Sequence, residues 1–239
     1  MNIIIPTKNN PMGVCSLVGA LLSQVPVNGL KPTLWIVDAS DTPIIFHGQL
    51  IRLMMCLPFH YFRSQDGCSV NGQRMLAMDN IGTGKAALLD DDNIPLSGYY
   101  RALTECLDDR HPAIFGVTVD SCNERRYPDY TLTGGEEDCF AFTPGAVGFS
   151  RSEKVEKTGA NIGNVVFEVE LLRELLYEAT LLSQDPSVVD DAAAIAMARK
   201  TGGILHNGLA AWHIGNSNNN WGHPNRLKHS VVDQVAKGL

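Results

Sequence analysis

Apolar residues along the first 120 positions alternate between two patterns. Short runs rich in β-branched and aromatic residues predict strands at residues 2–5, 33–37, 58–63, 85–89 and 113–119. Between them, apolar residues spaced three or four positions apart predict helices at residues 13–24, 47–56, 72–80 and 97–109. Ser97 is the expected N-cap of the last helix. Strands that alternate with helices indicate an α/β fold with a Rossmann-like, mostly parallel central sheet.

The second half of the chain is less regular. Apolar spacing predicts helices at residues 167–182 and 190–200, and residues 140–150 resemble an interrupted strand. The polar stretch 120–139 is expected to be a long functional loop. Residues 215–225 are rich in Asn and Gly, and we expect a tail there that is mobile until something binds.

Composition and charge exclude several classes of protein. A chain of 239 residues without an internal repeat predicts one domain over residues 1–239. The net charge of −7 argues against nucleic acid or an anionic membrane as the main partner, since both require a basic face. The six cysteines are scattered without a C-x-x-C pair and are interpreted as reduced thiols of a cytoplasmic protein. No apolar run approaches the roughly 20 residues of a membrane-spanning helix, and a signal peptide is not expected.

Three consecutive carboxylates, Asp90, Asp91 and Asp92, follow the strand predicted at residues 85–89. Like charges this close repel each other, so the cluster is costly unless a cation or a positive group lies beside it. Mg²⁺ and Mn²⁺ take oxygen ligands, usually one or two carboxylates together with substrate phosphates. The alternative is a solvated turn whose aspartates cap the next helix. The apolar strand before the triplet favours a metal-bridged phosphate site.

Four segments in a fixed order resemble the nucleotide-sugar half of family-2-like glycosyltransferases with the GT-A fold. They are Ile3–Pro11, Trp35–Ser40, Gly72–Arg74 and Leu88–Asp92. Members of that family show strands ending in I-P-T-x-N, V-D-D-G-S and L-D-D-D, with an A-R-N segment in between. The resemblance is good over about the first 100 residues and looser beyond them. It implies a single GT-A-like domain, in which residues 1–110 bind the nucleotide sugar and residues 111–239 bind the acceptor.

The resemblance implies donor-binding roles for five residues of the first half. Pro6, Thr7 and Lys8 would border the nucleoside base, which their main-chain groups would hydrogen-bond. Asp38 would accept hydrogen bonds from the base or ribose, at the carboxyl end of a strand, where ligands bind in open α/β sheets. Arg74 would approach the base or the diphosphate. The structural alternatives are a strand-end turn for Thr7 and Lys8, a helix N-cap for Asp38 and a surface position for Arg74.

The resemblance also divides the acidic triplet by role. Asp90 would contact the ribose or sugar, and Asp92 would bind the metal ion that bridges both phosphates. Asp91 belongs to the same donor site or points away into the fold. The ion, Mn²⁺ or Mg²⁺, would neutralise charge on the leaving nucleoside diphosphate. His213 lies where several GT-A enzymes place a metal-binding histidine, and an imidazole beside Asp92 would favour Mn²⁺. His206 and His223 are the competing candidates.

A second acidic pair, Asp190–Asp191, opens a predicted helix, and Gly202 follows eleven residues after Asp191. The family carries an acidic pair, usually Glu-Asp, at that separation from a glycine. By resemblance, Asp191 is the general base that removes the proton of the acceptor hydroxyl in an inverting transfer. The chain departs from the pattern because Asp190 replaces the usual Glu. The alternative is a pair of acids that stabilises the start of a helix through its macrodipole.

These features predict a metal-dependent glycosyltransferase that moves a sugar from a nucleoside-diphosphate sugar, with a UDP-sugar favoured, to a hydroxyl acceptor. The acceptor would be a glycan or a lipid-linked glycan, and inverting chemistry is favoured over retaining chemistry. One alternative is a nucleotidyltransferase, which ordinarily has a glycine-rich loop where this chain has Thr7–Gly13. Another is a non-catalytic module that binds nucleotide sugars, for which loss of Asp191 would not matter.

Overall fold

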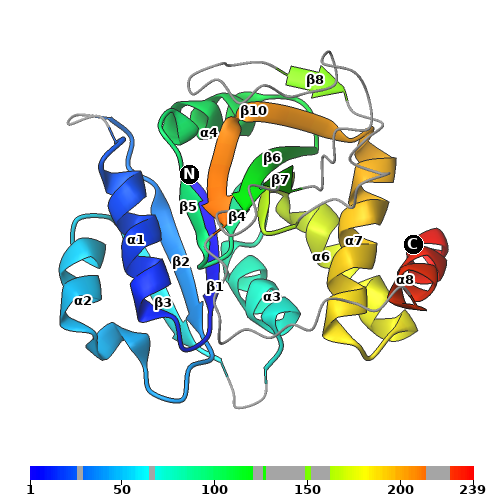
Figure 1. Cartoon of the computed structure of the whole chain (residues 1–239), viewed down its shortest axis with the longest axis horizontal. Helices are drawn as coiled ribbons and strands as arrows, with labels where there is room; N and C mark the ends of the chain where they lie inside the picture. Colours follow the sequence, from blue (N-terminus) through cyan, green and yellow to red (C-terminus); the bar gives the residue numbers. More distant parts are fainter. Residues whose placement is uncertain (26–28, 65–67, 121–125, 128–148, 152–161, 214–226) are drawn as a thin grey trace.

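A mixed β-sheet forms the centre of the computed structural model, with helices on both faces (Figure 1). The structure describes residues 1–25, 29–64, 68–120, 126–127, 149–151, 162–213 and 227–239. Its strands are β1 (Asn2–Thr7), β2 (Thr33–Asp38), β3 (Phe59–Arg63), β4 (Lys85–Leu89), β5 (Asn93–Pro95), β6 (Ala113–Asp120), β7 (Arg126–Tyr127), β8 (Phe149–Arg151), β9 (Asn164–Glu168) and β10 (Ile204–His213). The main path through the sheet is β3-β2-β1-β4-β9-β6-β10-β5, with β7 paired to β6 and β8 to β10.

Most long strands run in one direction. β3, β2, β1 and β4 are parallel neighbours, and β10 is parallel to β6. β9 lies antiparallel to both β4 and β6, so β6 and β10 run in the same direction as β1. The carboxyl ends of these six strands therefore share one edge of the sheet, the edge where open α/β sheets bind ligands. The predicted mostly parallel sheet is confirmed, with β9 inserted in the opposite direction.

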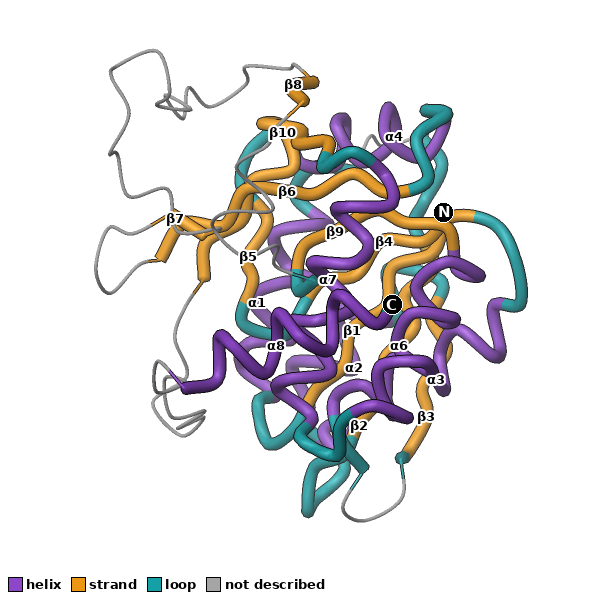
Figure 2. The backbone as a smooth tube through the Cα atoms, turned by 90° about the vertical axis from the view of Figure 1, so that its right-hand side faces the viewer, coloured by secondary structure: helices purple, strands orange, loops and turns teal. Residues whose placement is uncertain are grey.

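Two hydrophobic cores pack against the two faces of the sheet. One face is covered by α1 (Pro11–Leu22), η1 (Ile44–Phe46), α2 (Gly48–Met54) and α4 (Tyr99–Asp108). The other is covered by α3 (Val70–Ile81), α6 (Val169–Leu182), α7 (Pro186–Thr201) and α8 (Leu227–Gly238), of which α6, α7 and α8 face the viewer in Figure 2. Along β1, Ile3 and Ile5 enter the first core and Ile4 the second. Burial on both faces explains the continuous apolar runs of the central strands.

The predicted elements of the first half are confirmed with shifted ends, but other details of the prediction are wrong or incomplete. Gly98 in a left-handed conformation, and not Ser97, is the N-cap of α4, and it makes no side-chain capping bond. Phe167 belongs to β9, so the helix predicted from that residue begins at Val169. The helix predicted at residues 190–200 begins at Pro186 with Asp185 as its N-cap, so Asp190 and Asp191 lie inside it and do not open it. Among the described elements, η1, β5, β7, β9, β10 and α8 were not predicted. The expectations for residues 120–139, 140–150 and 215–225 fall mostly outside the described residues.

Two further expectations concern the membrane and the cysteines. Within the described ranges, no helix is both long and apolar enough to cross a membrane. Cys15, Cys56, Cys68 and Cys106 are free cysteines, as predicted. The remaining two cysteines lie outside the described residues.

Candidate functional site

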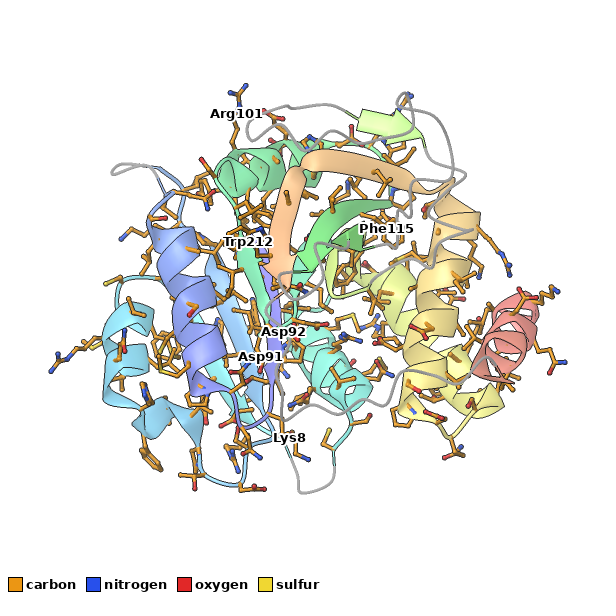
Figure 3. The ribbon with its side chains drawn as sticks, in the orientation of Figure 1. Lys8, Asp91, Asp92, Arg101, Phe115 and Trp212 are labelled. Atoms are coloured by element: carbon orange, nitrogen blue, oxygen red, sulfur yellow. The ribbon has the colours of Figure 1, made fainter. Side chains whose placement is uncertain are left out.

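The acidic triplet forms a tight turn at the carboxyl end of β4 (Figure 3). The backbone N–H of Asn93 donates to the Asp90 carbonyl over 2.9 Å, and the N–H of Asp90 donates to the Gly163 carbonyl over 3.0 Å. The Asn93 side-chain amide donates to the same Gly163 carbonyl over 2.8 Å. Within this turn Asp91 is buried, whereas Asp90 and Asp92 are half-buried. The three carboxylates therefore occupy different environments.

Arg74 of α3 connects the triplet to α7. Its guanidinium donates from Nη2 to Asp90 Oδ1 over 2.9 Å and from Nη1 to Asp190 Oδ1. Nη1 also donates to Asn71 Oδ1 over 3.0 Å. The Arg74 side chain is only 1% exposed, so its charge depends on both carboxylates for compensation. Through Arg74, two acidic segments that lie far apart in the sequence are fixed at one edge of the sheet.

The two acids of α7 differ in their surroundings. Burial raises the pKa of Asp190 to about 6, the charge of Arg74 acts in the opposite direction, and the charges of Asp90 and Asp191 raise the pKa further. Asp190 pairs with Arg74, whose positive charge favours the ionised carboxylate. Asp191 is exposed, because consecutive helical residues point about 100° apart. Asp190 thus ties α7 to Arg74, and the neighbouring Asp191 is exposed at the surface of the same helix. The role of general base predicted for Asp191 stays a prediction. The helix ends at Gly202, whose left-handed φ of 81° suits a glycine.

Asp91 points into the fold, one of the two outcomes expected for it. The Thr7 hydroxyl donates to Asp91 Oδ2 over 2.5 Å, and the Asn10 amide lies 3.5 Å from the Asp91 carbonyl oxygen. Burial raises the pKa of Asp91 to about 7, and the hydrogen bond from Thr7 opposes this rise. A Cβ atom on Gly13 would come within 2.3 Å of the Asp91 carbonyl oxygen, so glycine lets α1 approach the turn. Asp91 therefore positions its neighbours and does not face the edge of the sheet.

Replacing Asp91 with asparagine should raise the melting temperature more at pH 8 than at pH 5. The folded pKa of about 7 lies above the unfolded value of about 3.9. The folded state therefore binds more protons at Asp91 between these values, so the contribution of Asp91 to stability is lost as the pH rises from about 4 to about 7. Asparagine keeps an acceptor for Thr7 but cannot ionise. Thermal melts with a chelator present measure the effect, with exposed Asp79→Asn as the control. If the melting temperature of Asp91→Asn relative to the wild type falls as the pH rises, the raised pKa of a buried Asp91 is contradicted.

Asp38 ends β2 with both carboxylate oxygens engaged by the protein itself. Oδ1 accepts from the Ser40 N–H over 2.8 Å. Oδ2 accepts from the Ile44 N–H and from Arg63 Nη1, each over 2.9 Å, and from the Tyr61 hydroxyl. Burial raises the pKa of Asp38, but these bonds outweigh it and the pKa is lowered. Three of these four donors contact Oδ2, and one contacts Oδ1. The contact predicted between Asp38 and a base or ribose stays a prediction, and the geometry favours a role in ordering the loop after β2.

Gln73, which sequence reasoning missed, joins the ends of β1 and β2. Its buried Nε2 donates to the Thr7 carbonyl over 2.8 Å and to the Val37 carbonyl over 3.1 Å. The available signal was the run of polar residues at the start of the helix predicted at residues 72–80. In the structure Asn71, Gln73 and Arg74 are all buried. These side chains replace apolar packing with hydrogen bonds beneath the carboxyl edge of the sheet.

The three residues predicted to border a base are not equally accessible. Pro6 and Thr7 are buried, and the Thr7 carbonyl accepts from the Ala39 N–H over 2.9 Å as well as from Gln73. Lys8 is exposed, and Figure 3 shows it at the same end of β1 as Asp91 and Asp92. Lys8 is therefore the one of the three whose side chain is presented outward at this edge.

The carboxyl end of β10 reaches the triplet. The sheet register pairs His213 with Asn93, which directly follows Asp92 in the sequence. The backbone of His213 therefore lies beside the acidic turn, although its side chain is not among those described. His206 lies in the opposite half of β10, fully buried, with Nε2 at 3.7 Å from a glutamate of α4. His223 lies outside the described residues. Register thus favours His213 over His206 as the histidine near Asp92.

The donor atoms at this edge suit a hard divalent cation that shares its ligands with a substrate. Among the described side chains, no group of three or more His, Cys, Asp or Glu residues is placed to hold a metal ion. Asp90 and Asp92 offer carboxylate oxygens at the turn, and Mg²⁺ or Mn²⁺ ordinarily adds waters and substrate phosphates to one or two carboxylates. The residues therefore fit an ion that binds together with a diphosphate.

The fold is that of the GT-A glycosyltransferases. Three solved structures show the likeness. TarS 1–349 of S. aureus in complex with UDP-GlcNAc has a TM-score of 0.63 and 11% identity, over 99% of this chain and 65% of that one. Mannosyltransferase PcManGT of Pyrobaculum calidifontis, with GDP-Man and Mn²⁺, has a TM-score of 0.56 and 12% identity, over 91% and 57%. GalNAc-T7 with UDP, GalNAc and Mn²⁺ has a TM-score of 0.59 and 13% identity, over 99% and 47%.

The likeness to known proteins is confined to the fold. No protein-family model matches the chain, and no curated protein sequence matches it significantly. Identities of 11–13% establish a common fold and no more. The chain also spans only about half to two thirds of the length of the three solved structures. The predicted GT-A-like fold is therefore confirmed, whereas the likeness does not establish an activity.

Proposed function

We propose that this protein is a metal-dependent glycosyltransferase that moves a sugar from a nucleoside-diphosphate sugar to a hydroxyl acceptor. The observation that carries the proposal is the bridge through Arg74, which holds Asp90 at the end of β4 and Asp190 of α7 at one edge of the sheet. This bridge fixes the acidic turn after β4 relative to a helix that presents an exposed carboxylate. The likeness to GT-A structures that contain UDP-GlcNAc or GDP-Man supports the same function.

On the donor side, Asp92 would hold Mn²⁺ or Mg²⁺, with His213 as a second protein ligand. The bound ion would neutralise charge on the departing diphosphate. Asp90 would contact the ribose or sugar while Arg74 fixes its orientation, and exposed Lys8 would lie beside the nucleotide. UDP is the favoured nucleotide. Manganese is present in two of the three similar structures described above, which supports the choice of ion.

On the acceptor side, Asp191 would act as the general base. Asp191 would accept the proton of an acceptor hydroxyl as that oxygen attacks the anomeric carbon. Its exposed position on α7, next to the Asp190 that pairs with Arg74, supports this role. The hydroxyl would attack from the face opposite the diphosphate, and the configuration at the anomeric carbon would invert. A glycan or a lipid-linked glycan would supply the hydroxyl.

A panel of nucleotide sugars with Mn²⁺ tests the proposal. A donor at about 100 times its Kd stabilises the folded protein by about 2.7 kcal/mol, which is a shift of about 5–10 °C for a chain of this size. The matching donor should also be hydrolysed slowly, with water in place of the acceptor. Chelation of the metal, or replacement of Asp92 with alanine, should remove the shift, and the control Asp79→Ala should retain it.

Two results would count against the proposal. The first is a panel in which no nucleotide sugar stabilises the protein with either Mn²⁺ or Mg²⁺. The second is donor binding that is unchanged in the Asp92→Ala variant, which would remove the metal from that residue. Nucleoside triphosphates belong in the same panel, because stabilisation by them alone would favour nucleotidyl transfer.

A further inference from the structure

The first 65 residues carry the opposite charge to the rest of the chain. They contain two acidic and four basic residues, whereas residues 66–239 contain 24 acidic and 15 basic residues. One of the two acids, Asp38, is fully buried and paired with Arg63. α1, η1 and α2 contain no acidic residue. The net charge of the whole chain therefore hides a weakly basic side, and such asymmetry is a signal for an anionic partner.

Large apolar side chains are exposed on this same side. Phe46 at the end of η1 is 77% exposed, and Ile51 and Met55 are 38% and 77% exposed. Ile51 and Met55 are four residues apart and share the outer face of α2, next to exposed Arg52. We call Phe46, Ile51, Arg52 and Met55 the α2 patch. Figure 1 shows α2 at the outer edge of the molecule, on the opposite side from α6, α7 and α8.

Lys31 adds a second cation to the α2 patch. Its Nζ donates to the carbonyl of Cys56, the residue after Met55, over 3.2 Å. Leu30, next to Lys31, is 82% exposed. A helix that exposes large apolar residues beside cations suits the interface of an anionic bilayer. There the apolar side chains enter the boundary below the headgroups, while Lys and Arg stay beside the lipid phosphates.

An exposed apolar surface on α6 provides an internal comparison. Tyr177 and Leu181 are 58% and 68% exposed, much like the residues of the α2 patch. Exposed Glu170 and Glu174 lie on the same helix. A negatively charged bilayer would repel those carboxylates. The apolar residues of the α2 patch and of α6 are therefore similarly exposed. The two surfaces differ in the charge beside these residues, which is positive at the α2 patch and negative on α6.

We propose that the α2 patch docks this protein onto the surface of an anionic lipid bilayer, with α2 lying along the headgroups. The patch is attached to the carboxyl edge of the sheet, because the N–H of Ile44, at the start of η1, donates to Asp38 Oδ2 over 2.9 Å. Docking would therefore hold the candidate site close to the membrane. The proposal concerns binding, and it does not depend on the proposed activity.

Co-sedimentation of the purified chain with lipid vesicles, without any nucleotide, tests the docking. The protein should bind vesicles that contain phosphatidylglycerol more than vesicles of phosphatidylcholine alone, and added salt should weaken the binding. The double variant Phe46→Ser, Met55→Ser should lower the partition coefficient about tenfold or more. The matched variant Tyr177→Ser, Leu181→Ser removes an aromatic and an aliphatic side chain of similar exposure and should bind like the wild type. Melting curves check that both variants are folded.

Three outcomes would overturn the docking. One is the absence of binding to phosphatidylglycerol vesicles. Another is equal binding by the wild type and the Phe46, Met55 double variant. The third is a dimer in lipid-free solution that this double variant abolishes, because a second copy would then cover the α2 patch. Since no nucleotide sugar is present, each of these results leaves the proposed glycosyl transfer unaffected.

Discussion

Replacing Arg74 with leucine should destabilise the folded protein by about 3–5 kcal/mol, the range for removing one partner of a buried ion pair. The guanidinium is 1% exposed and lies between Asp90 and Asp190. Leucine fills part of the volume but donates no hydrogen bond, so two partly buried carboxylates would face each other without compensation. Urea unfolding of the variant and the wild type measures the difference.

The effect of Arg74→Leu should depend on pH. Without Arg74, the pKa of Asp190, already raised to about 6, should rise further. An acid with a raised folded pKa loses its contribution as the pH rises through that value, so the variant should be weakest above about pH 7 and recover toward pH 5. Adding Asp190→Asn to the variant should restore part of the stability at pH 8, because one of the two opposed charges is removed.

Arg199→Leu provides the control for this prediction. Arg199 pairs with Asp233 over 3.1 Å, but the side chains are 30% and 46% exposed, so its loss should cost under about 1 kcal/mol. A similar cost for the Arg74 and Arg199 variants would contradict a buried bridge between the two acidic segments. A cost for Arg74→Leu that is the same at pH 5 and pH 8 would show that lost packing, and not charge, is responsible.

The sequence predicted the elements whose local pattern agrees with their final environment. β1, β2 and β4 are apolar runs that are buried on both faces, and turn or cap residues separate them from their helices. β9 was missed because its apolar run continues into α6, where Glu168 provides no side-chain cap. β10 was missed because its register shifts between Leu205 and Ala210, where polar and glycine residues interrupt the alternation. Helix and strand periodicities are local signals, and these two elements depend on their partners in the sheet.

For the candidate site, too, some features were predictable from the sequence and others were not. Resemblance placed the triplet and the Asp190–Asp191 pair in a common donor and acceptor site, and the structure brings the two acidic segments together. The means by which they meet was not predictable, because Arg74 and Asp190 are 116 residues apart. The bond from Thr7 to Asp91 is equally non-local, and it makes a residue expected to border the base into an anchor for the turn. The sequence shows which side chains can donate or accept hydrogen bonds. The partner that each of them binds depends on the fold.

Replacing Asp191 with asparagine should lower the rate of sugar transfer by about 10²–10⁴-fold, the usual contribution of a general base. Slow hydrolysis of the matching donor should fall in the same way, because water also needs a base, and this measurement requires no knowledge of the acceptor. Asp191 is exposed, and Asp190 makes the bond to Arg74, so folding stability should change by less than about 0.5 kcal/mol. Donor affinity, measured by thermal shift with Mn²⁺, should be close to that of the wild type.

Comparison with Asp190→Asn makes the Asp191 result specific. The neighbouring variant removes one carboxylate from Arg74, so it should lower stability, whereas Asp191→Asn should lower turnover alone. If Asp191→Asn loses donor binding together with turnover, the residue belongs to the donor site and the base is another group. If Asp191→Asn retains full turnover, the exposed carboxylate has no part in proton transfer, and α7 serves only to hold the acidic turn through Arg74.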